Sequence, residues 1–338
     1  MKSRLRALLR TRSGHGRRTV VLPLAALAAG AALVLTFGTN PASAIASPSS
    51  CTVPTGTLSP ADLPAGTSAV GCSLVGRVVR KNGLGVTVPA PGETVSISRT
   101  LASGEGLEFE LAVSPDGVIT FPLEDGTSDV TTVEAAADPA ACSDGKYSTA
   151  DRKEYGTYNW YIGDGAMPAG LTQSAAAHYF EDAVNNITDS YNDCGLTDTV
   201  SAKESYQGTT TYEADINSSG DCTSRDHKST WDAGNLPSNT VAETCAFTKS
   251  MPGVKNDLLE ADVRYNTSDY RFTNNPASSC SDLYDVRSVG THEAGHVFGL
   301  KDLGSGHAGL TMYKDSFTCS TAARTLGRGD VLGLRSIY

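Results

Sequence analysis

The most informative stretch of this sequence is residues 291–302, which read THEAGHVFGLKD. His292 and His296 are four positions apart, so in a helix both imidazoles project from one face, a single turn apart. Zinc accepts neutral imidazole nitrogen at about 2.0–2.1 Å and, in catalytic sites, keeps one position for water. Glu293 follows the first histidine and is placed beside the metal rather than on it, which makes it the candidate general base. The stretch therefore predicts a helix that carries a catalytic zinc site.

A catalytic zinc ion needs a third protein ligand, and here that ligand must come from beyond the helix. Gly299 can adopt the left-handed conformation that ends a helix, so that the chain can return to the metal by residue 302. Residue 302 is Asp, whose carboxylate is an accepted zinc ligand. His307 is the alternative third ligand, and the spacing favours Asp302 over it.

The surrounding residues 139–338 show the mixed pattern of an α+β domain. Apolar residues recur at three- and four-residue steps between residues 172 and 191, which predicts an amphipathic helix. Residues 285–300 predict a second helix, which carries the histidines and ends near Gly299. Residues 258–265 alternate in part between apolar and polar side chains and therefore predict a strand.

The preceding residues 45–138 have a different sequence pattern, in which short β-prone runs alternate with turn-forming residues such as Lys81-Asn82-Gly83 and Pro115-Asp116-Gly117. The β-prone runs are residues 78–79, 85–88, 94–97, 107–111 and 118–121. They predict a small antiparallel β-sandwich of the immunoglobulin or transthyretin type. The small, unpatterned stretch at residues 133–139 is the expected linker to the α+β domain.

Residues 1–44 have the pattern of a signal peptide. Seven Lys and Arg residues precede or flank the start of an apolar run from Val20 to Phe37, and small residues at 42 and 44 suit signal peptidase. Cleavage there would make Ile45 the first residue of a secreted protein. The alternative is an uncleaved membrane anchor, since the apolar run is long enough to span a bilayer.

The charge of the remaining chain disfavours two classes of partner. Without residues 1–44, 20 basic residues face 37 acidic ones, a net charge of −17. Such a surface repels phosphate backbones and anionic lipids, so we expect neither nucleic-acid binding nor stable membrane association.

All eight cysteines follow residue 44, and none forms a Cys-x-x-Cys pair. An even number of cysteines in an exported chain predicts disulfides rather than a thiolate metal site. Proximity in the sequence suggests the pairs Cys51–Cys72 and Cys222–Cys245, and a Cys280–Cys319 bridge would clamp the segment with the histidines.

On these residues the sequence resembles the metzincin clan of zinc metalloproteases, whose pattern is His-Glu-x-x-His-x-x-Gly-x-x-His/Asp. Leu310-Thr311-Met312-Tyr313 resembles the turn with a methionine under the metal that follows this pattern in the clan. Residues 324–338 are similar to the last helix of matrixin-like enzymes, and Asp302 as third ligand is similar to the snapalysin group. Residues 159–162 and 168–171 resemble the first strand and its connection to the first helix.

The resemblance implies a metzincin-like catalytic domain with a mixed twisted sheet and long helices. It also implies that residues 240–247 form an edge strand with which an extended peptide pairs. Two features of the clan are not recognisable here. The histidine-rich loop that binds a structural zinc is missing, and so is the Pro-Arg-Cys-Gly motif of cysteine-based latency.

The expected function is therefore that of a secreted, monomeric zinc endopeptidase that uses one catalytic zinc ion and cleaves protein or peptide substrates. Two alternatives stay open at this point. One is a secreted zinc-containing adhesion or binding protein without activity, and the other is a cell-wall amidase of narrow specificity. The acidic run at residues 215–232 could bind calcium, but a solvated loop is the favoured interpretation.

Overall fold

The computed structural model describes residues 51–104, 106–122 and 138–338. The expected signal peptide and residues 133–137 of the expected linker lie outside these described residues. The described residues form one compact unit.

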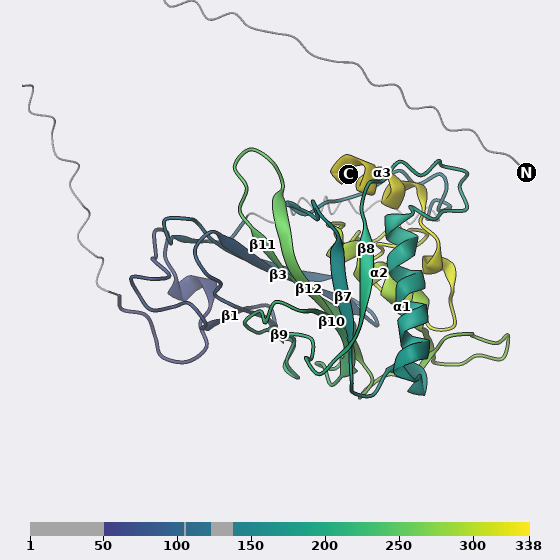
Figure 1. The fold of residues 1–338 in the computed structure, drawn as a ribbon, viewed down its shortest axis with the longest axis horizontal. Coiled ribbons are helices and arrows are strands. Elements are labelled where there is room, and N and C mark those ends of the chain that lie inside the picture. Colours follow the sequence, from purple (N-terminus) through teal and green to yellow (C-terminus); the bar gives the residue numbers. More distant parts are fainter. Residues whose placement is uncertain (1–50, 105, 123–137) are drawn as a thin grey trace, which may run out of the picture. The chain divides into compact units, whose positions relative to one another are not determined.

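Nine strands form the largest sheet among the described residues, in the order β5-β4-β3-β11-β12-β10-β7-β8, with β6 paired to β12 (Figure 1). Their bounds are β3 (Glu93–Leu101), β4 (Leu107–Val113), β5 (Ile119–Thr120), β6 (Arg152–Lys153), β7 (Tyr158–Gly163), β8 (Glu204–Thr210), β10 (Ser229–Gly234), β11 (Thr240–Lys249) and β12 (Asn256–Asn266). Strands β8, β7, β10 and β12 run parallel to one another, whereas β11 pairs with β12 in the antiparallel direction, and β3, β4 and β5 continue the sheet in antiparallel pairs. The sheet is therefore mixed.

The helices are α1 (Gln173–Thr188), α2 (Val286–Val297) and α3 (Arg328–Ile337), with 3-10 turns η1 (Pro60–Asp62), η2 (Pro168–Gly170) and η3 (Ala322–Arg324). The side chain of Thr172 caps α1 by accepting a hydrogen bond from the backbone of Ala175. Figure 1 shows α1 and α2 beside the β7–β8 half of the large sheet. The large aromatic residues Trp160, Phe180 and Trp231 are fully buried between the sheet and the helices. The predicted α+β class is thus confirmed, as are both predicted helices.

A second apolar core lies on the opposite face of the sheet, beneath a small sheet of β1 (Val78–Lys81), β2 (Leu84–Thr87) and β9 (Asp221–Cys222). Strand β11 contributes to both cores, because Ala246 belongs to the first, whereas Cys245 and Phe247 belong to the second. This alternation is the normal consequence of the two-residue period of a strand. The remaining short pair is β13 (Phe272–Thr273) with β14 (Tyr284–Asp285).

The structure differs here from the expected separation into a β-sandwich (45–138) and a second domain (139–338). The predicted strands exist, but β3 pairs with β11 along nearly its whole length and so joins the sheet of the later segment. Strand β9, also from the later segment, completes the small sheet. The two segments therefore share a sheet and a core, and no boundary between sheets coincides with residue 138.

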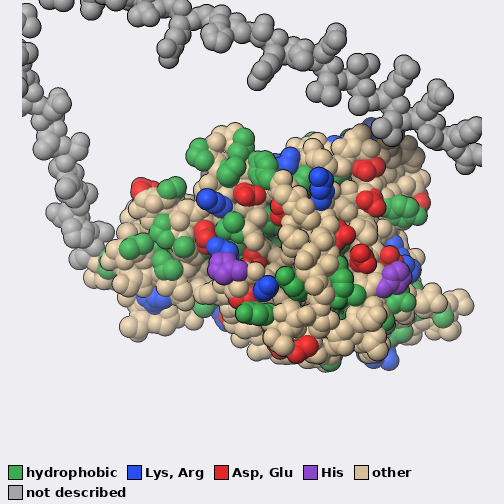
Figure 2. Space-filling model, in the orientation of Figure 1, with side chains coloured by type: hydrophobic (Ala, Val, Ile, Leu, Met, Phe, Trp, Pro, Cys, Tyr) green, Lys and Arg blue, Asp and Glu red, His purple; other side chains and the backbone are tan. Residues whose placement is uncertain are grey.

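Four disulfides join Cys51–Cys72, Cys142–Cys194, Cys222–Cys245 and Cys280–Cys319. Three of these are the pairs expected from the sequence, and their number is typical of a protein that folds in an oxidising compartment. Among the described residues, no helix is both long and apolar enough to cross a bilayer. Figure 2 shows acidic and basic side chains interspersed on the visible face rather than gathered in a basic patch.

Candidate metal centre

Helix α2 positions both histidines. Its N-terminus is capped by Asp285, whose carboxylate accepts a hydrogen bond from the backbone of Ser288 at 2.8 Å and also binds Arg324. One turn apart on the inner face, the Nε2 atoms of His292 and His296 lie 3.1 Å from each other. Both side chains are almost fully buried, so the helix presents two imidazole nitrogens to one small interior volume.

The chain after α2 brings Asp302 to the same volume. The backbone of Gly299 has φ +94°, and the amides of Gly299 and Leu300 bond back to the carbonyls of His296 and Gly295. These are the two bonds of a Schellman motif, which reverses the chain at a helix C-terminus. The Oδ1 atom of Asp302 then lies 3.1 Å from Nε2 of His292 and 3.3 Å from Nε2 of His296.

The donor set fits zinc. Ligand atoms placed about 2.0–2.1 Å from a tetrahedral ion are about 3.3 Å from one another, close to the separations of these three side chains. Apart from the two imidazoles, neither buried oxygen of Asp302 has a hydrogen-bond donor among the described residues. Two nitrogens and one carboxylate that face one another without other partners are the arrangement a divalent cation requires.

The outer nitrogens of the imidazoles are held by backbone carbonyls. Nδ1 of His292 lies 2.8 Å from the oxygen of Thr311, and Nδ1 of His296 lies 3.2 Å from the oxygen of Leu300. A carbonyl only accepts, so each Nδ1 carries a proton, and Nε2 is the ring nitrogen that faces the shared volume and can bind a metal once it has lost its own proton. The tautomers are therefore those that metal binding needs.

A buried carboxylate that the sequence reasoning missed supports this arrangement. Asp330 in α3 accepts hydrogen bonds from the backbone of Thr311 at 2.9 Å, Met312 at 3.2 Å and Gly327 at 2.8 Å. Burial raises the pKa of Asp330, and these three donors act in the opposite direction. Asp330 thereby fixes the carbonyl that orients His292, and nothing in its sequence context distinguishes it from an ordinary first-turn aspartate.

Met312 packs against α2 at Gly295, the residue before His296. A Cβ atom added at Gly295 would be only 2.2 Å from its sulfur, so the absent side chain at 295 is what makes room for Met312. Its carbonyl accepts a bond from Leu303, which ties the turn to the segment that carries Asp302.

His307 is not part of the group. Its Nδ1 atom pairs with Asp144 at 2.8 Å, so of the two alternatives for the third ligand the structure brings Asp302, and not His307, to the histidines.

The carboxylate of Glu293 is fully buried and accepts two hydroxyl hydrogen bonds. Thr100 donates to Oε1 at 2.7 Å, and Thr244 donates to Oε2 at 2.5 Å. Burial lowers the pKa of His292. The hydrogen bond and the charge of Asp302, followed by the charge of Glu293, outweigh this effect of burial and raise the pKa of His292 to about 9. The pKa of Asp302 is held below its ordinary value, because the charge of His296 and the hydrogen bonds of both histidines exceed the effect of burial.

The expected edge strand at residues 240–247 is an inner strand, which corrects the sequence-based interpretation. Strand β3 pairs with it on the side away from β12. Strands β3 and β11 are far apart in the chain. Local sequence patterns indicate each strand but not that the two strands pair with each other.

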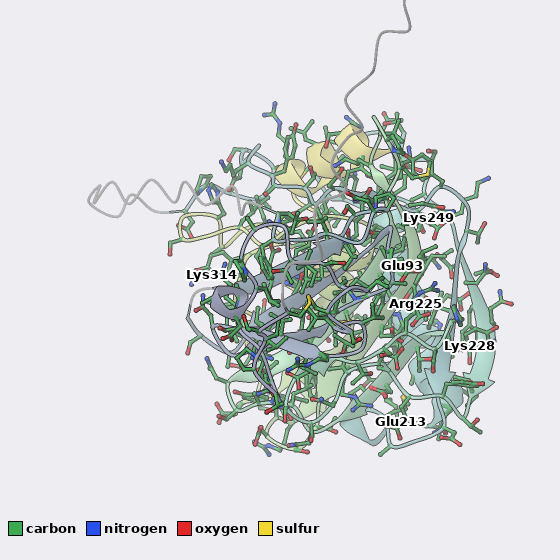
Figure 3. All side chains as sticks on the ribbon, turned by 90° about the vertical axis from the view of Figure 1, so that its left-hand side faces the viewer. Glu93, Glu213, Arg225, Lys228, Lys249 and Lys314 are labelled. Atoms are coloured by element: carbon green, nitrogen blue, oxygen red, sulfur yellow. A yellow bond between two sulfur atoms is a disulfide. The ribbon has the colours of Figure 1, made fainter. Side chains whose placement is uncertain are left out.

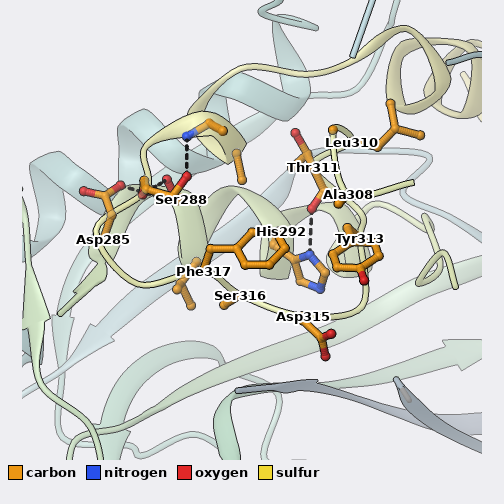
Figure 4. A pocket seen from close by; sticks show the side chains of 15 residues that line it. Asp285, Ser288, His292, Ala308, Leu310, Thr311, Tyr313, Asp315, Ser316 and Phe317 are labelled. Atoms are coloured by element: carbon orange, nitrogen blue, oxygen red, sulfur yellow. Dashed lines mark hydrogen bonds between the residues drawn. The ribbon is translucent and has the colours of Figure 1, made fainter. Parts of the chain in front are cut away.

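A pocket opens beside His292 (Figure 4). Its wall combines Ser288 and Val289 of α2 with the chain from residue 308 to residue 317. Tyr313 and Phe317 stack in this wall with ring centroids 5.6 Å apart. The pocket is therefore partly aromatic and directly adjoins one of the three candidate ligands.

A second group of candidate ligands consists of Asp215, Asp226 and Glu260, in the region where calcium was considered. The backbone amide of Asp226 donates to both Asp215 and Glu260. Burial, followed by the proximity of Asp215, raises the pKa of Glu260 to about 8. Burial and the repulsion among these carboxylates thus both favour the uncharged form of Glu260.

Comparison of the chain with models of protein families and with curated proteins found no match. What the site does must therefore be inferred from its geometry.

Proposed function

We propose that this protein is a secreted zinc-dependent endopeptidase of the metzincin type. The observation that carries the proposal is the convergence of His292, His296 and Asp302 within hydrogen-bonding distance of one another, with Glu293 next to the first of them. The disulfides and the candidate signal peptide support secretion. The partly aromatic pocket beside His292 supports a substrate that inserts a side chain there.

The roles of the residues follow from their contacts. His292, His296 and Asp302 would hold the zinc ion, which would act as a Lewis acid that activates water and polarises a carbonyl at neutral pH. Glu293 accepts the proton of the attacking water and delivers it to the leaving amine. Thr244 holds one oxygen of that carboxylate in place. The carbonyl of Thr311 keeps His292 in the tautomer that leaves Nε2 free for the metal.

The test pairs metal analysis with peptide hydrolysis. We expect one zinc ion per chain in the wild type and in Glu293→Gln, and none in His296→Ala. Glu293→Gln should reduce hydrolysis of a peptide library by at least about a hundredfold, the contribution expected of a general base. Retained hydrolysis by Glu293→Gln, or a wild-type protein that binds no stoichiometric zinc, would overturn the proposal.

A further inference from the structure

The C-terminal end of α2 is buried, so its last carbonyl groups need hydrogen-bond donors from the protein itself. The carbonyl of His296 accepts two hydrogen bonds from the guanidinium of Arg152, one from Nε at 2.9 Å and one from Nη2. It also accepts a bond from the amide of Gly299 at 3.1 Å, in the turn that ends the helix. Arg152 is therefore bonded to the backbone of one candidate ligand residue, at the point where the chain turns toward the next.

The surroundings of Arg152 are unusual for a charged side chain. Arg152 is 4 % exposed, and its Nη1 atom donates to the hydroxyl of Ser96 at 2.5 Å. Burial lowers the pKa of Arg152, and the charges of Glu110 and Glu108 oppose this effect. The carbonyl groups at a helix C-terminus carry a partial negative charge, which stabilises a nearby cation. The guanidinium and the end of α2 therefore stabilise each other.

The chain next to Arg152 holds the same turn through its backbone. Thr149 forms an antiparallel bridge with Leu300, and the amide of Ala150 donates to the carbonyl of Gly299 at 2.9 Å. The carbonyl of Leu300 in turn lies 3.2 Å from Nδ1 of His296 and orients its imidazole. One short segment thus fixes both the end of the helix and the carbonyl that orients the ring.

A small displacement of this turn would move the candidate metal ligands. Asp302 is two residues beyond Leu300, so the position of its carboxylate depends on the position of the turn. Zinc ligands need distances within about 0.2 Å of their ideal values. Without the guanidinium, the buried carbonyl of His296 would lose two of its donors and the turn would relax to satisfy it. The site would keep its three ligand side chains but not their spacing.

We infer that Arg152 is a positioning residue of the candidate metal centre, whose guanidinium holds the carbonyl of His296 and the turn before Asp302 in the arrangement that binds zinc. Arg152 acts through the backbone of His296 and not through its imidazole. Lysine cannot replace it fully, because one ammonium group does not reproduce the planar fork that bonds His296 and Ser96 together. This inference rests on the proposed zinc-dependent function.

Arg264 offers a matched control, because it is a similarly buried arginine at a different place. It is 7 % exposed, and its guanidinium pairs with Asp232 at 2.6 Å and with Glu213 at 2.9 Å. Its neighbours along β12 belong to the core shared with the helices, so Arg264 faces the other side of the sheet. Figure 3 shows Glu213 well apart from Lys314, whose amide is bonded to the segment that carries the third candidate ligand.

The experiment uses the full chain with its disulfides intact and replaces each of the two arginines by lysine and by methionine. Competition with a chromophoric chelator measures the affinity for zinc. Amide hydrogen exchange at Gly299 and Leu300, in the metal-free protein, reports the turn without any contribution from metal or activity. Urea unfolding in the presence of a chelator shows how much stability each variant loses, so that a general loss of stability can be separated from a local effect.

We expect Arg152→Met to weaken zinc binding about tenfold or more and to speed exchange at the two amides, with Arg152→Lys between it and the wild type. Both Arg264 variants should unfold at lower urea but keep the zinc affinity and the exchange of the wild type. The inference would be overturned if Arg152→Met changed neither quantity, or if Arg264→Met weakened zinc binding as much.

Two further results have a defined meaning. If a methionine variant did not fold, the same comparison between Arg152→Lys and Arg264→Lys would decide the role of Arg152. If the wild type bound no zinc, the endopeptidase proposal would be overturned, and unchanged exchange at Gly299 and Leu300 in the Arg152 variants would then overturn the positioning role as well.

Discussion

Replacing Gly299 with alanine tests the turn that brings Asp302 to the histidines. The backbone there has φ +94°, and an added Cβ would meet the carbonyl oxygen of Arg152 at 2.8 Å and Ile337 at 3.3 Å. The left-handed conformation costs an L-residue about 1–2 kcal/mol. Overpacking against a fixed carbonyl adds about 1–3 kcal/mol. Alanine also stiffens the unfolded chain, which returns up to about 1 kcal/mol.

The net loss of unfolding free energy should therefore be near 3 kcal/mol, roughly a 4–5 °C decrease in Tm for a chain of this size. Urea unfolding followed by circular dichroism, with a chelator present and the disulfides intact, measures this loss without a metal contribution. Gly304→Ala is the matched control, since Gly304 is exposed and has no atom within 4 Å of an added Cβ. If Gly299→Ala differed from that control by less than about 0.5 kcal/mol, the account of the turn would be refuted.

Three further predictions concern the metal ligands, the candidate base and the acidic group. Asp302→Asn should weaken zinc binding more than about a hundredfold, whereas His307→Ala should leave zinc binding unchanged. Competition with a chromophoric chelator measures both affinities. The reverse pattern would make His307, and not Asp302, the third ligand. Thr244→Val removes a hydroxyl donor from buried Glu293 and should lower the unfolding free energy by about 1–3 kcal/mol in urea titrations, an effect whose absence would contradict the hydrogen bond. The folded-state pKa of Glu260, about 8, is above its ordinary value of 4.5, so the folded protein binds more protons than the unfolded chain between these values and stability falls as pH rises. The unfolding free energy should change with pH by at most about 1.4 kcal/mol per pH unit, and Glu260→Gln should reduce this slope. Unfolding curves at pH 5, 6.5 and 8 measure it. An unchanged slope in Glu260→Gln would contradict the raised pKa of Glu260.

The elements of the candidate site that could be predicted are those set by local geometry. The four-residue spacing of His292 and His296 works only on a helix, and Gly299 supplies the conformation that ends it. Asp302 comes three residues after Gly299, where the chain reverses. Its approach to the histidines therefore depends on local chain geometry and not on distant residues. The disulfide Cys222–Cys245 was foreseeable for a related reason, since a short loop brings its ends together at a small entropic cost.

The partners of the strands could not be predicted in the same way. The alternation of residues 94–97 indicates a strand, but it does not indicate which other strand lies beside it. The assignment of residues 45–138 to a separate sandwich failed on this point, because Val95 and Ile97 face a core that also contains Phe247. Likewise, the hydrogen bond from Thr100 to Glu293 joins residues 193 positions apart.

Helix α2 and the chain reversal after it could thus be predicted from residues 291–302, because helical hydrogen bonds and turn conformations link residues only a few positions apart. The occupation of β11 by β3, and with it the burial of Glu293, arose only when the whole chain packed. A strand completes its hydrogen bonds with whichever neighbour folding brings alongside, and the residues that decide this neighbour are spread over both cores.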